Sequence, residues 1–249
     1  MPKFFVNKSQ VKNNTIEIIG EDINHIKNVL RKNVDDIIEV CNQDDGQNYL
    51  VQIKGLNKNI IKCEIKQKLE SKTESNIYVH ILQGLPKTDK MEMIIQKSVE
   101  LGASEISPVS MKRCVAKIAP KDELKKMERW QKISEVAAKQ CGRNIIPQIN
   151  NIIEVKDICK FCKDYDIIIV AYENEKENKL KDELVKLKEK RKSDFKIAIV
   201  IGPEGGLEQE EVRYLKQNGA KIVTLGNRIL RTETAPINIL SCIMYELET

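Results

Sequence analysis

The chain has 249 residues, of which 41% are hydrophobic and 32% charged, enough to bury one large core or two smaller ones. No apolar run approaches the ~20 residues of a membrane helix, which excludes a membrane-spanning protein. Residues 1–6 lack the apolar region of a secretory signal, so we expect a cytoplasmic protein without a membrane partner.

The seven cysteines are an odd number scattered along the chain, which argues against a secreted disulfide framework. Cys159 and Cys162 have CxxC spacing, but no second CxxC and no paired histidine follows them. A helical repeat that buries both thiols is a simpler interpretation than a zinc or redox site. We therefore expect no metal site.

The formal net charge is +5, and the excess of lysine and arginine lies between residues 83 and 143. A basic stretch of this kind is typical of a partner that carries phosphate groups, such as a nucleic acid. A solvated, lysine-rich helix would give the same pattern, so charge leaves both interpretations open.

The first part of the chain alternates apolar and polar residues with turn signals between the segments, which predicts a small β-barrel or sandwich. The expected strands are 15–18, 37–41, 49–53 and 60–65, and one helix is expected over 21–32. Residues 70–75 are polar and break both periodicities. We place a domain boundary there, with domains over 1–72 and 73–249.

From residue 77 on, apolar strands alternate with amphipathic helices, a pattern that predicts an α/β domain with a mostly parallel sheet covered on both faces. The expected strands are 78–82, 106–109, 167–171, 197–201 and 222–225, and the expected helices are 89–101, 121–140, 177–191, 208–218 and 234–247.

Ligands of open α/β sheets bind beyond the carboxyl ends of the strands, so the loops there are the places to search for a site. Three loops stand out, namely 83–90, the glycine-rich 202–206 and the segment 226–235. None has the GxGxxG dinucleotide pattern or the GxxxxGK[ST] phosphate loop. Taken alone, each loop is better explained as a plain strand-to-helix turn.

Together and in this order, four motifs carry a family resemblance. They are Leu85-Pro86-Lys87, IIQKSVELG at 94–102, IGPEGG at 201–206 and LGNRILRTETA at 225–235, and HIKNVLR at 25–31 adds an amino-terminal signature. In these motifs the chain resembles the RsmE family, the 16S ribosomal RNA uridine-N3 methyltransferases of the SPOUT superfamily. The likeness extends over nearly the whole chain.

This resemblance implies a SPOUT trefoil-knot methyltransferase domain with a parallel sheet, preceded by a small PUA-like, RNA-binding β-barrel. It also implies S-adenosyl-L-methionine (SAM) as cofactor, a homodimer, and methylation of N3 of a specific uridine in 16S ribosomal RNA of the small ribosomal subunit, a step of ribosome biogenesis. Three positions depart from the family pattern. Lys3 stands where an arginine is usual, Asp35 where a glycine is usual, and Pro236 where a small residue is usual.

By the same resemblance we assign candidate site residues. Arg231 is expected to lie near the uracil or its phosphate, with a salt bridge at the start of the last helix as the alternative. Glu233 is expected to accept a proton or, alternatively, to stabilise the helix amino terminus. The cofactor pocket is assigned to Leu85, Pro86, Lys87, Gly202, Pro203, Glu204, Gly205, Gly206, Leu225, Gly226, Ile229 and Leu230. The RNA contacts are assigned to Lys3, His25, Arg31, Lys112, Arg113 and Arg143.

Some interpretations stay open at this point. The apolar stripe of the last helix, which includes Ile239, Ile243 and Leu247, can form a dimer contact or belong to the core of one chain. A methyltransferase for another RNA is the first alternative function. A non-enzymatic RNA-binding or assembly factor is the second, and a nucleotide-dependent oxidoreductase is the third and the least favoured, because its fingerprint is missing.

Overall fold

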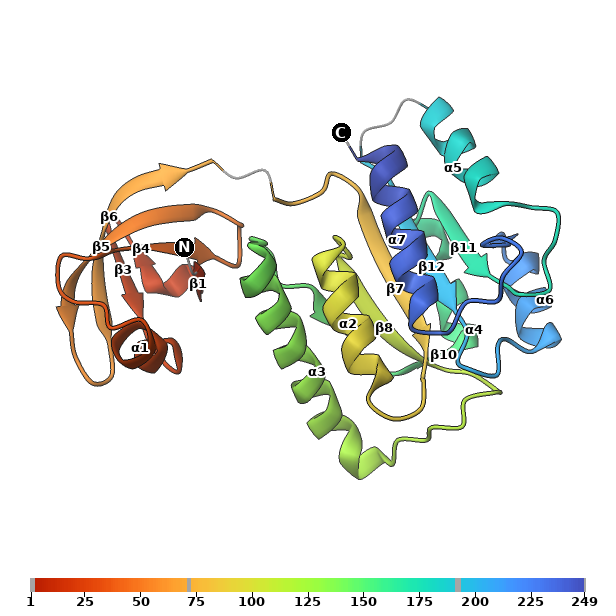
Figure 1. Cartoon of the computed structure of the whole chain (residues 1–249), viewed down its shortest axis with the longest axis horizontal. Coiled ribbons are helices and arrows are strands. Elements are labelled where there is room, and N and C mark those ends of the chain that lie inside the picture. The colour runs from red at the N-terminus through yellow and green to blue at the C-terminus, as the bar shows by residue number, and fades with distance from the viewer. Residues whose placement is uncertain (1–2, 71–72, 191–193, 249) are drawn as a thin grey trace. The chain divides into compact units, whose positions relative to one another are not determined.

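The computed structural model describes residues 3–70, 73–190 and 194–248, and it divides the chain into two compact units (Figure 1). Unit 1 contains residues 1–74 and 138–146, and unit 2 contains 75–137 and 147–249. Residue 72, where we place the domain boundary, lies outside the described residues. The periodicity of the sequence does not predict that segment 138–146 belongs to unit 1.

Unit 1 is built on a six-stranded sheet with the order β1-β4-β5-β6-β3-β2, in which β1 pairs parallel with β4 and the other pairs are antiparallel. Two register shifts in the pairing of β5 with β6 bend the sheet around a core that includes Phe4, Val51 and Ile53. The strands are β1 (Lys3–Val6), β2 (Val11–Lys12), β3 (Thr15–Ile18), β4 (Ile37–Asn42), β5 (Asn48–Leu56) and β6 (Ile61–Leu69), and a 3-10 turn spans Lys8–Gln10. The predicted strands are thus present, and β1 and β2 are additional.

The predicted helix over 21–32 is shorter in the structure. It consists of α1 (Asp22–Asn24) and a π-helical turn over His25–Val29, closed by a 2.9 Å bond from the Leu30 N–H to the His25 carbonyl. Arg31 then has φ +52°, a left-handed conformation in which a helix cannot continue. The prediction was wrong at its carboxyl end for this reason.

Asp35, one of the departures from the family pattern, has φ +74°. Its backbone N–H donates to the Ile53 carbonyl at 2.8 Å, and its carboxylate lies 3.4 Å from the Lys54 ammonium. An L-residue with a Cβ is strained in this region, whereas glycine is not. The glycine that is usual at this position therefore matches the backbone.

We expect Asp35→Gly to be more stable than Asp35→Ala by about 1 kcal/mol, because only alanine retains the Cβ strain at a positive φ. Both variants lose the carboxylate, so its contacts cancel in the comparison. Urea unfolding of the two variants measures the difference. Equal midpoints would mean that the loop relaxes to another φ without cost.

Unit 2 contains a sheet with the order β10-β8-β7-β12-β11-β13, in which all pairs are parallel and β9 also pairs with β8. The strands are β7 (Tyr78–Gly84), β8 (Glu105–Ser110), β9 (Gln148–Ile149), β10 (Ile153–Glu154), β11 (Ile167–Ala171), β12 (Lys196–Ile201) and β13 (Lys221–Val223). The five predicted strands are confirmed. The short strands β9 and β10 were not predicted, because two residues give no periodicity.

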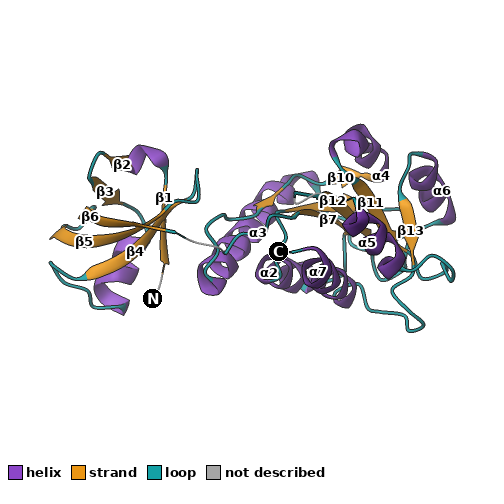
Figure 2. Ribbon diagram, turned by 90° about the horizontal axis from the view of Figure 1, so that it is seen from above, coloured by secondary structure: helices purple, strands orange, loops and turns teal. Residues whose placement is uncertain are grey.

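Helices cover both faces of this sheet, as Figure 2 shows for α2 and α7 on one face and α4 on the other. The helices are α2 (Lys90–Glu100), α3 (Pro120–Cys141), α4 (Val155–Ile158), α5 (Leu180–Glu189), α6 (Gln209–Gln217) and α7 (Thr234–Leu247), with a 3-10 segment over Cys159–Asp164. Residue 191, the predicted end of the fourth helix, lies outside the described residues. The α/β architecture with a mostly parallel sheet is therefore as expected.

The apolar stripe of α7 belongs to the core of unit 2. Ile239, Leu240 and Ile243 have no exposed surface, and Leu247 is nearly buried. Cys159 and Cys162 are half-buried and pack against the core on the opposite face of the sheet, as a structural role predicts.

His80 on β7 is buried in a polar network. Its Nδ1 lies 2.6 Å from the Tyr165 hydroxyl and 3.8 Å from a Glu105 carboxylate oxygen, and its Nε2 lies 2.8 Å from Ser107 Oγ. Burial disfavours the charged ring and lowers the pKa of His80 below its usual value.

Stability should consequently fall in mild acid. As the pH falls, the unfolded chain binds a proton at His80 before the folded chain does. The free energy of unfolding therefore keeps its full value above the ordinary histidine pKa of about 6.5 and decreases below it, by at most about 1.4 kcal/mol per pH unit. Urea unfolding at several pH values between about 7.5 and 5.5 tests this range. His80→Gln should flatten the slope, and an unchanged slope would assign it to other groups.

Candidate active site

Three loops meet at the carboxyl edge of the parallel strands of unit 2. They follow β11, β12 and β13, and together they enclose a pocket of about 520 Å³. This is the edge where an open α/β sheet binds its ligand. The pocket is lined by Lys90, Ala171, Tyr172, Glu173, Lys176, Ile201, Gly202, Pro203, Glu204, Gly205, Gly206, Thr224, Leu225, Gly226, Asn227, Arg228, Ile229, Leu230, Arg231, Thr232 and Ala235.

A buried set of hydrogen bonds ties the end of β7 to two of these loops. Gln83 Nε2 donates to Thr232 Oγ1 at 2.9 Å, and Thr232 Oγ1 donates to the Gly202 carbonyl at 2.7 Å. Gln83 is completely buried, and its Oε1 has no hydrogen-bond partner among the described residues, so its amide is held through Nε2 alone. The bond between Thr232 and Gly202 therefore joins two residues that line the pocket.

Gly84 allows the β7 end and the 202–206 loop to come into contact. A Cβ on Gly84 would lie 2.7 Å from both Cδ and the backbone nitrogen of Pro203 and 2.8 Å from the Met111 sulfur. Gly206 has φ +69° and would meet the Glu173 carboxylate if it carried a side chain. Both positions need glycine for steric reasons.

Charged groups of both signs lie at the pocket. Lys90 Nζ is 3.2 Å from Glu204 Oε1 and 3.1 Å from Glu233 Oε2, and the Lys87 backbone N–H donates to Glu204 Oε1 at 3.0 Å. Burial opposes ionisation of Glu204, but the backbone N–H groups and the Lys90 ammonium outweigh it and lower the pKa of Glu204. Hydrogen bonds to Glu233 and Glu204 raise the pKa of Lys90.

Arg231 is exposed and lines the pocket. Within residues 3–70, 73–190 and 194–248 its guanidinium has no hydrogen-bond or ion-pair partner, so the alternative of a helix-start salt bridge finds no partner there. Glu233 occupies the N-cap position of α7 but makes no capping hydrogen bond. Pro236 lies in the first turn of α7, where the missing N–H costs no helical bond.

The predicted cofactor residues are largely brought together. Those at 202–206 and at 225, 226, 229 and 230 line the pocket. Leu85, Pro86 and Lys87 do not line it, although the Lys87 backbone N–H donates to Glu204. Lys90, Lys176, Tyr172 and Glu173 also line the pocket but are not among the residues predicted from the sequence. The last three follow the predicted strand 167–171. Their position just after the end of a strand is the signal that could have identified them.

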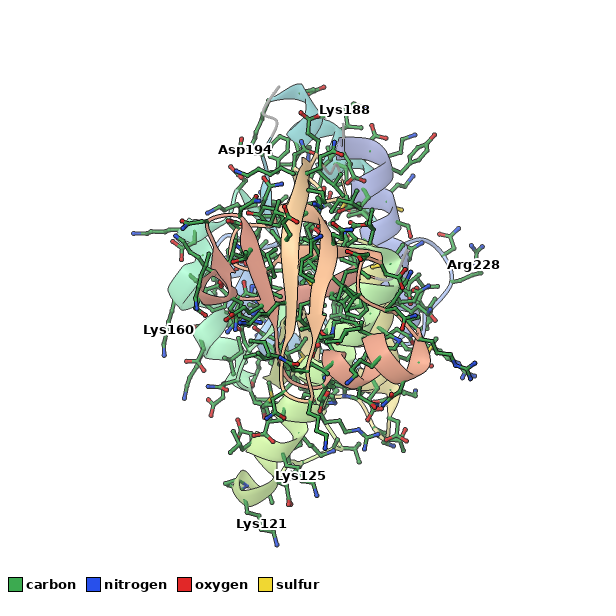
Figure 3. The ribbon with its side chains drawn as sticks, turned by 90° about the vertical axis from the view of Figure 1, so that its left-hand side faces the viewer. Lys121, Lys125, Lys160, Lys188, Asp194 and Arg228 are labelled. Carbon is green, nitrogen blue, oxygen red and sulfur yellow. The ribbon has the colours of Figure 1, made fainter. Side chains whose placement is uncertain are left out.

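Arg228 and Ile229 form the outer part of the pocket wall. The Arg228 side chain extends away from its loop (Figure 3), and Ile229 is 83% exposed. Exposed arginine and isoleucine side chains beside a pocket are available to a large ligand.

The predicted RNA contacts fall into two groups. Lys3 and Arg143 are buried in unit 1, where the Lys3 ammonium donates to the Gly142 carbonyl at 2.9 Å and to Asn144 Oδ1 at 2.7 Å, and Arg143 binds Glu74 at 2.7 Å. Those contacts give both side chains structural roles. His25 and Arg31 in unit 1, and Lys112 and Arg113 in unit 2, are exposed.

The two exposed residues of unit 2 are already paired with acids of the α6 region. Arg113 Nε donates to Glu208 at 2.8 Å and its Nη1 donates to the Gly205 carbonyl at 3.0 Å, and Lys112 pairs with Glu210. Arg113 therefore contacts the glycine loop of the pocket directly.

Comparison with known proteins agrees with this geometry. Residues 73–244 match the family described as RNA methyltransferase domain, and residues 18–66 match the family described as RNA methyltransferase PUA domain. The fold and the pocket thus define the class, a PUA-containing RNA methyltransferase.

The chain is 37% identical to ribosomal RNA small subunit methyltransferase E of Bacillus subtilis, covering 100% of this chain and 98% of the relative. It is 35% identical to the protein of that name in Mesomycoplasma hyopneumoniae, over 97% of this chain and 98% of the relative. The chain belongs to the ribosomal RNA small subunit methyltransferase E family.

Two solved structures with the same fold contain a cofactor. The methyltransferase E of Neisseria gonorrhoeae, bound to S-adenosyl methionine, has a TM-score of 0.86 and 28% identity over 100% of this chain and 98% of that chain. A putative methyltransferase of Legionella pneumophila in complex with SAM has a TM-score of 0.84 and 29% identity over 98% and 96% of the two chains.

The described residues contain no helix with the length and apolar character needed to cross a membrane. They also contain no cluster of three or more His, Cys, Asp or Glu side chains placed to hold a metal ion.

Proposed function

We propose that this protein transfers a methyl group from SAM to N3 of a uridine in 16S ribosomal RNA of the small ribosomal subunit. The observation that carries the proposal is the pocket at the carboxyl edge of the parallel sheet, built from the two motifs at 201–206 and 225–235. Relatives with the methyltransferase E name match this chain over nearly its full length, and two structural neighbours are bound to SAM.

The residues present fit SAM. A volume of about 520 Å³ is in the range of small-molecule sites, and the apolar Leu225, Ile229 and Leu230 can pack against an adenine ring. Glycines leave backbone N–H and C=O groups open for hydrogen bonds to it.

When bound, SAM supplies the methyl group from its sulfonium. The chain must then hold a uridine in line with that methyl group and stabilise the negative charge left on the ring when N3 loses its proton. Arg231 is the residue we assign to this charge, because it lines the pocket and its guanidinium has no internal partner in the described part of the chain. Glu233 remains the candidate proton acceptor, and its carboxylate lies 3.1 Å from the Lys90 ammonium.

RNA binding is assigned to both units. Arg113 and Lys112 lie beside the glycine loop, and His25 and Arg31 are exposed on unit 1. Lys3 and Arg143 are better described as residues that hold unit 1 together. Phosphate contacts should make the affinity for RNA fall with increasing salt concentration.

The same proposal includes the trefoil knot, the homodimer, the cytoplasmic location and the division into domains at 1–72 and 73–249. The bonds of Thr232 to Gly202 and of Gln83 to Thr232 support a chain that threads between the ends of β7 and β12. Because the apolar stripe of α7 is buried, a homodimer would use its other face, where Tyr245 is 91% exposed.

The test is a methyl-transfer assay with labelled SAM on small ribosomal subunits from cells that lack the gene, followed by nucleoside analysis. Label in 3-methyluridine establishes the reaction and the base together. Binding of SAM with label in another nucleoside would retain the methyltransferase and reject the assigned target. Parallel assays on naked 16S RNA and on tRNA distinguish the substrate form.

A further inference from the structure

Lys90 lies between two acids that come from different parts of unit 2. It is the first residue of α2, while Glu204 lies in the loop after β12 and Glu233 lies at the N-cap of α7. Its ammonium nitrogen is 3.2 Å from one carboxylate and 3.1 Å from the other. One side chain therefore connects three segments that form the pocket.

These three side chains are partly withdrawn from water, with exposed fractions of 31% for Lys90, 25% for Glu204 and 13% for Glu233. An ion pair is stronger when its members are partly dehydrated, and breaking it is costly because the remaining charge is left without a partner. Removal of Lys90 would leave two carboxylates facing each other across a single vacated position.

The pairing also explains why Arg231 is available. Arg231 precedes Glu233 by two residues, and a guanidinium readily forms bidentate pairs with nearby carboxylates. Yet in the described residues it has no such partner, whereas both Glu204 and Glu233 are paired with Lys90. By occupying the two acids, Lys90 leaves the guanidinium of Arg231 for an anionic substrate.

We propose that Lys90 is a positioning residue of the methyl-transfer site: it neutralises Glu204 and Glu233, holds the glycine loop against the start of α7, and keeps Arg231 unpaired for the RNA. This inference rests on the proposed function and adds to it a residue outside the motifs assigned from the sequence. An RNA strand carries one negative charge per nucleotide, so two unpaired carboxylates at the pocket would repel it.

The test compares Lys90→Met with Lys90→Arg and with a matched control on the same helix. Lys97 suits the control, because its ammonium pairs with Glu100 at 2.8 Å and it does not line the pocket. The kcat/KM for methylation of small subunits should fall by about 10- to 100-fold in Lys90→Met, because substrate and cofactor are misplaced. Lys90→Arg should recover most of the loss, and Lys97→Met should behave as the unaltered protein.

A pH profile separates this role from a purely structural one. Without Lys90 the Glu204 carboxylate loses an adjacent cation, so the pKa of Glu204 rises and the acidic limb of the kcat profile should move to higher pH. The other charged groups that face the pocket are Glu173, Lys176, Arg228 and Arg231, and they are the same in all variants. Lys90→Arg should keep the limb in its original place.

A double variant keeps the proposal falsifiable if Lys90→Met proves unstable. Adding Glu204→Gln removes one of the unpaired carboxylates and should restore part of the activity and of the thermal stability. An unaltered acidic limb and kcat/KM in Lys90→Met, or no recovery in either Lys90→Arg or the double variant, would overturn the inference. Failure of the proposed function would look different, since the unaltered protein itself would then produce no labelled ribosomal RNA.

Discussion

Gly84→Ala should abolish SAM binding and lower the free energy of unfolding by about 2 to 3 kcal/mol, as overpacking of a dense interior does. The added methyl group would lie 2.7 Å from Pro203 and 2.8 Å from Met111, so the 202–206 loop must move away from β7. That movement would also break the hydrogen bonds from Gln83 to Thr232 and from Thr232 to Gly202, which join the end of β7 to the lining of the pocket.

Calorimetric titration with SAM and urea unfolding measure the two effects. Gly55→Ala is the matched control, because Gly55 also lies in a strand and an added Cβ there would meet only Lys62 Cβ at an ordinary 3.9 Å. We expect the control to bind SAM normally. SAM binding by Gly84→Ala with unaltered affinity would show that the 202–206 loop does not form the cofactor site.

Arg231→Met is expected to lower kcat by about 10²- to 10³-fold while the Kd for SAM stays within a few-fold, the usual consequence of removing a group that stabilises developing charge. Arg231→Lys should recover only part of the rate, because an ammonium lacks the planar fork of a guanidinium. Single-turnover methylation of small subunits and calorimetric titration with SAM separate these quantities.

Arg213 provides the control for charge, since it is exposed on α6 and does not line the pocket. Arg213→Met should methylate at the normal rate. If Arg231→Met instead raised only KM for the subunit, Arg231 would bind phosphate in the ground state and would not act on the uracil ring.

The sequence by itself determined the α/β architecture and the edge at which the site lies. The apolar segments of the sequence predict five strands of this sheet, because each segment records locally which of its own side chains must be buried. These strands are β7, β8, β11, β12 and β13. The glycine loop at 202–206 and the segment 226–235 were found as strand ends, and both line the pocket.

Only the tertiary structure decided which charges meet. Lys3 and Arg143 look like surface cations in the sequence, but each is buried against partners that the fold brings from elsewhere in unit 1, Asn144 in one case and Glu74 in the other. The stripe on α7 fits a dimer contact as well as a core, and burial of Ile239 and Ile243 assigns it to the core.

The meeting of Lys90 with Glu204 and Glu233 is of the same kind. More than a hundred residues separate Lys90 from either acid, and no periodicity or spacing connects them. β7 and β12 are neighbours in the sheet, which sets the segment that leads to Lys90 beside the loop that carries Glu204, and Glu233 is added by the N-cap of α7. Local patterns record how a segment buries its own side chains, whereas ion pairs between distant segments depend on a topology that no single segment contains.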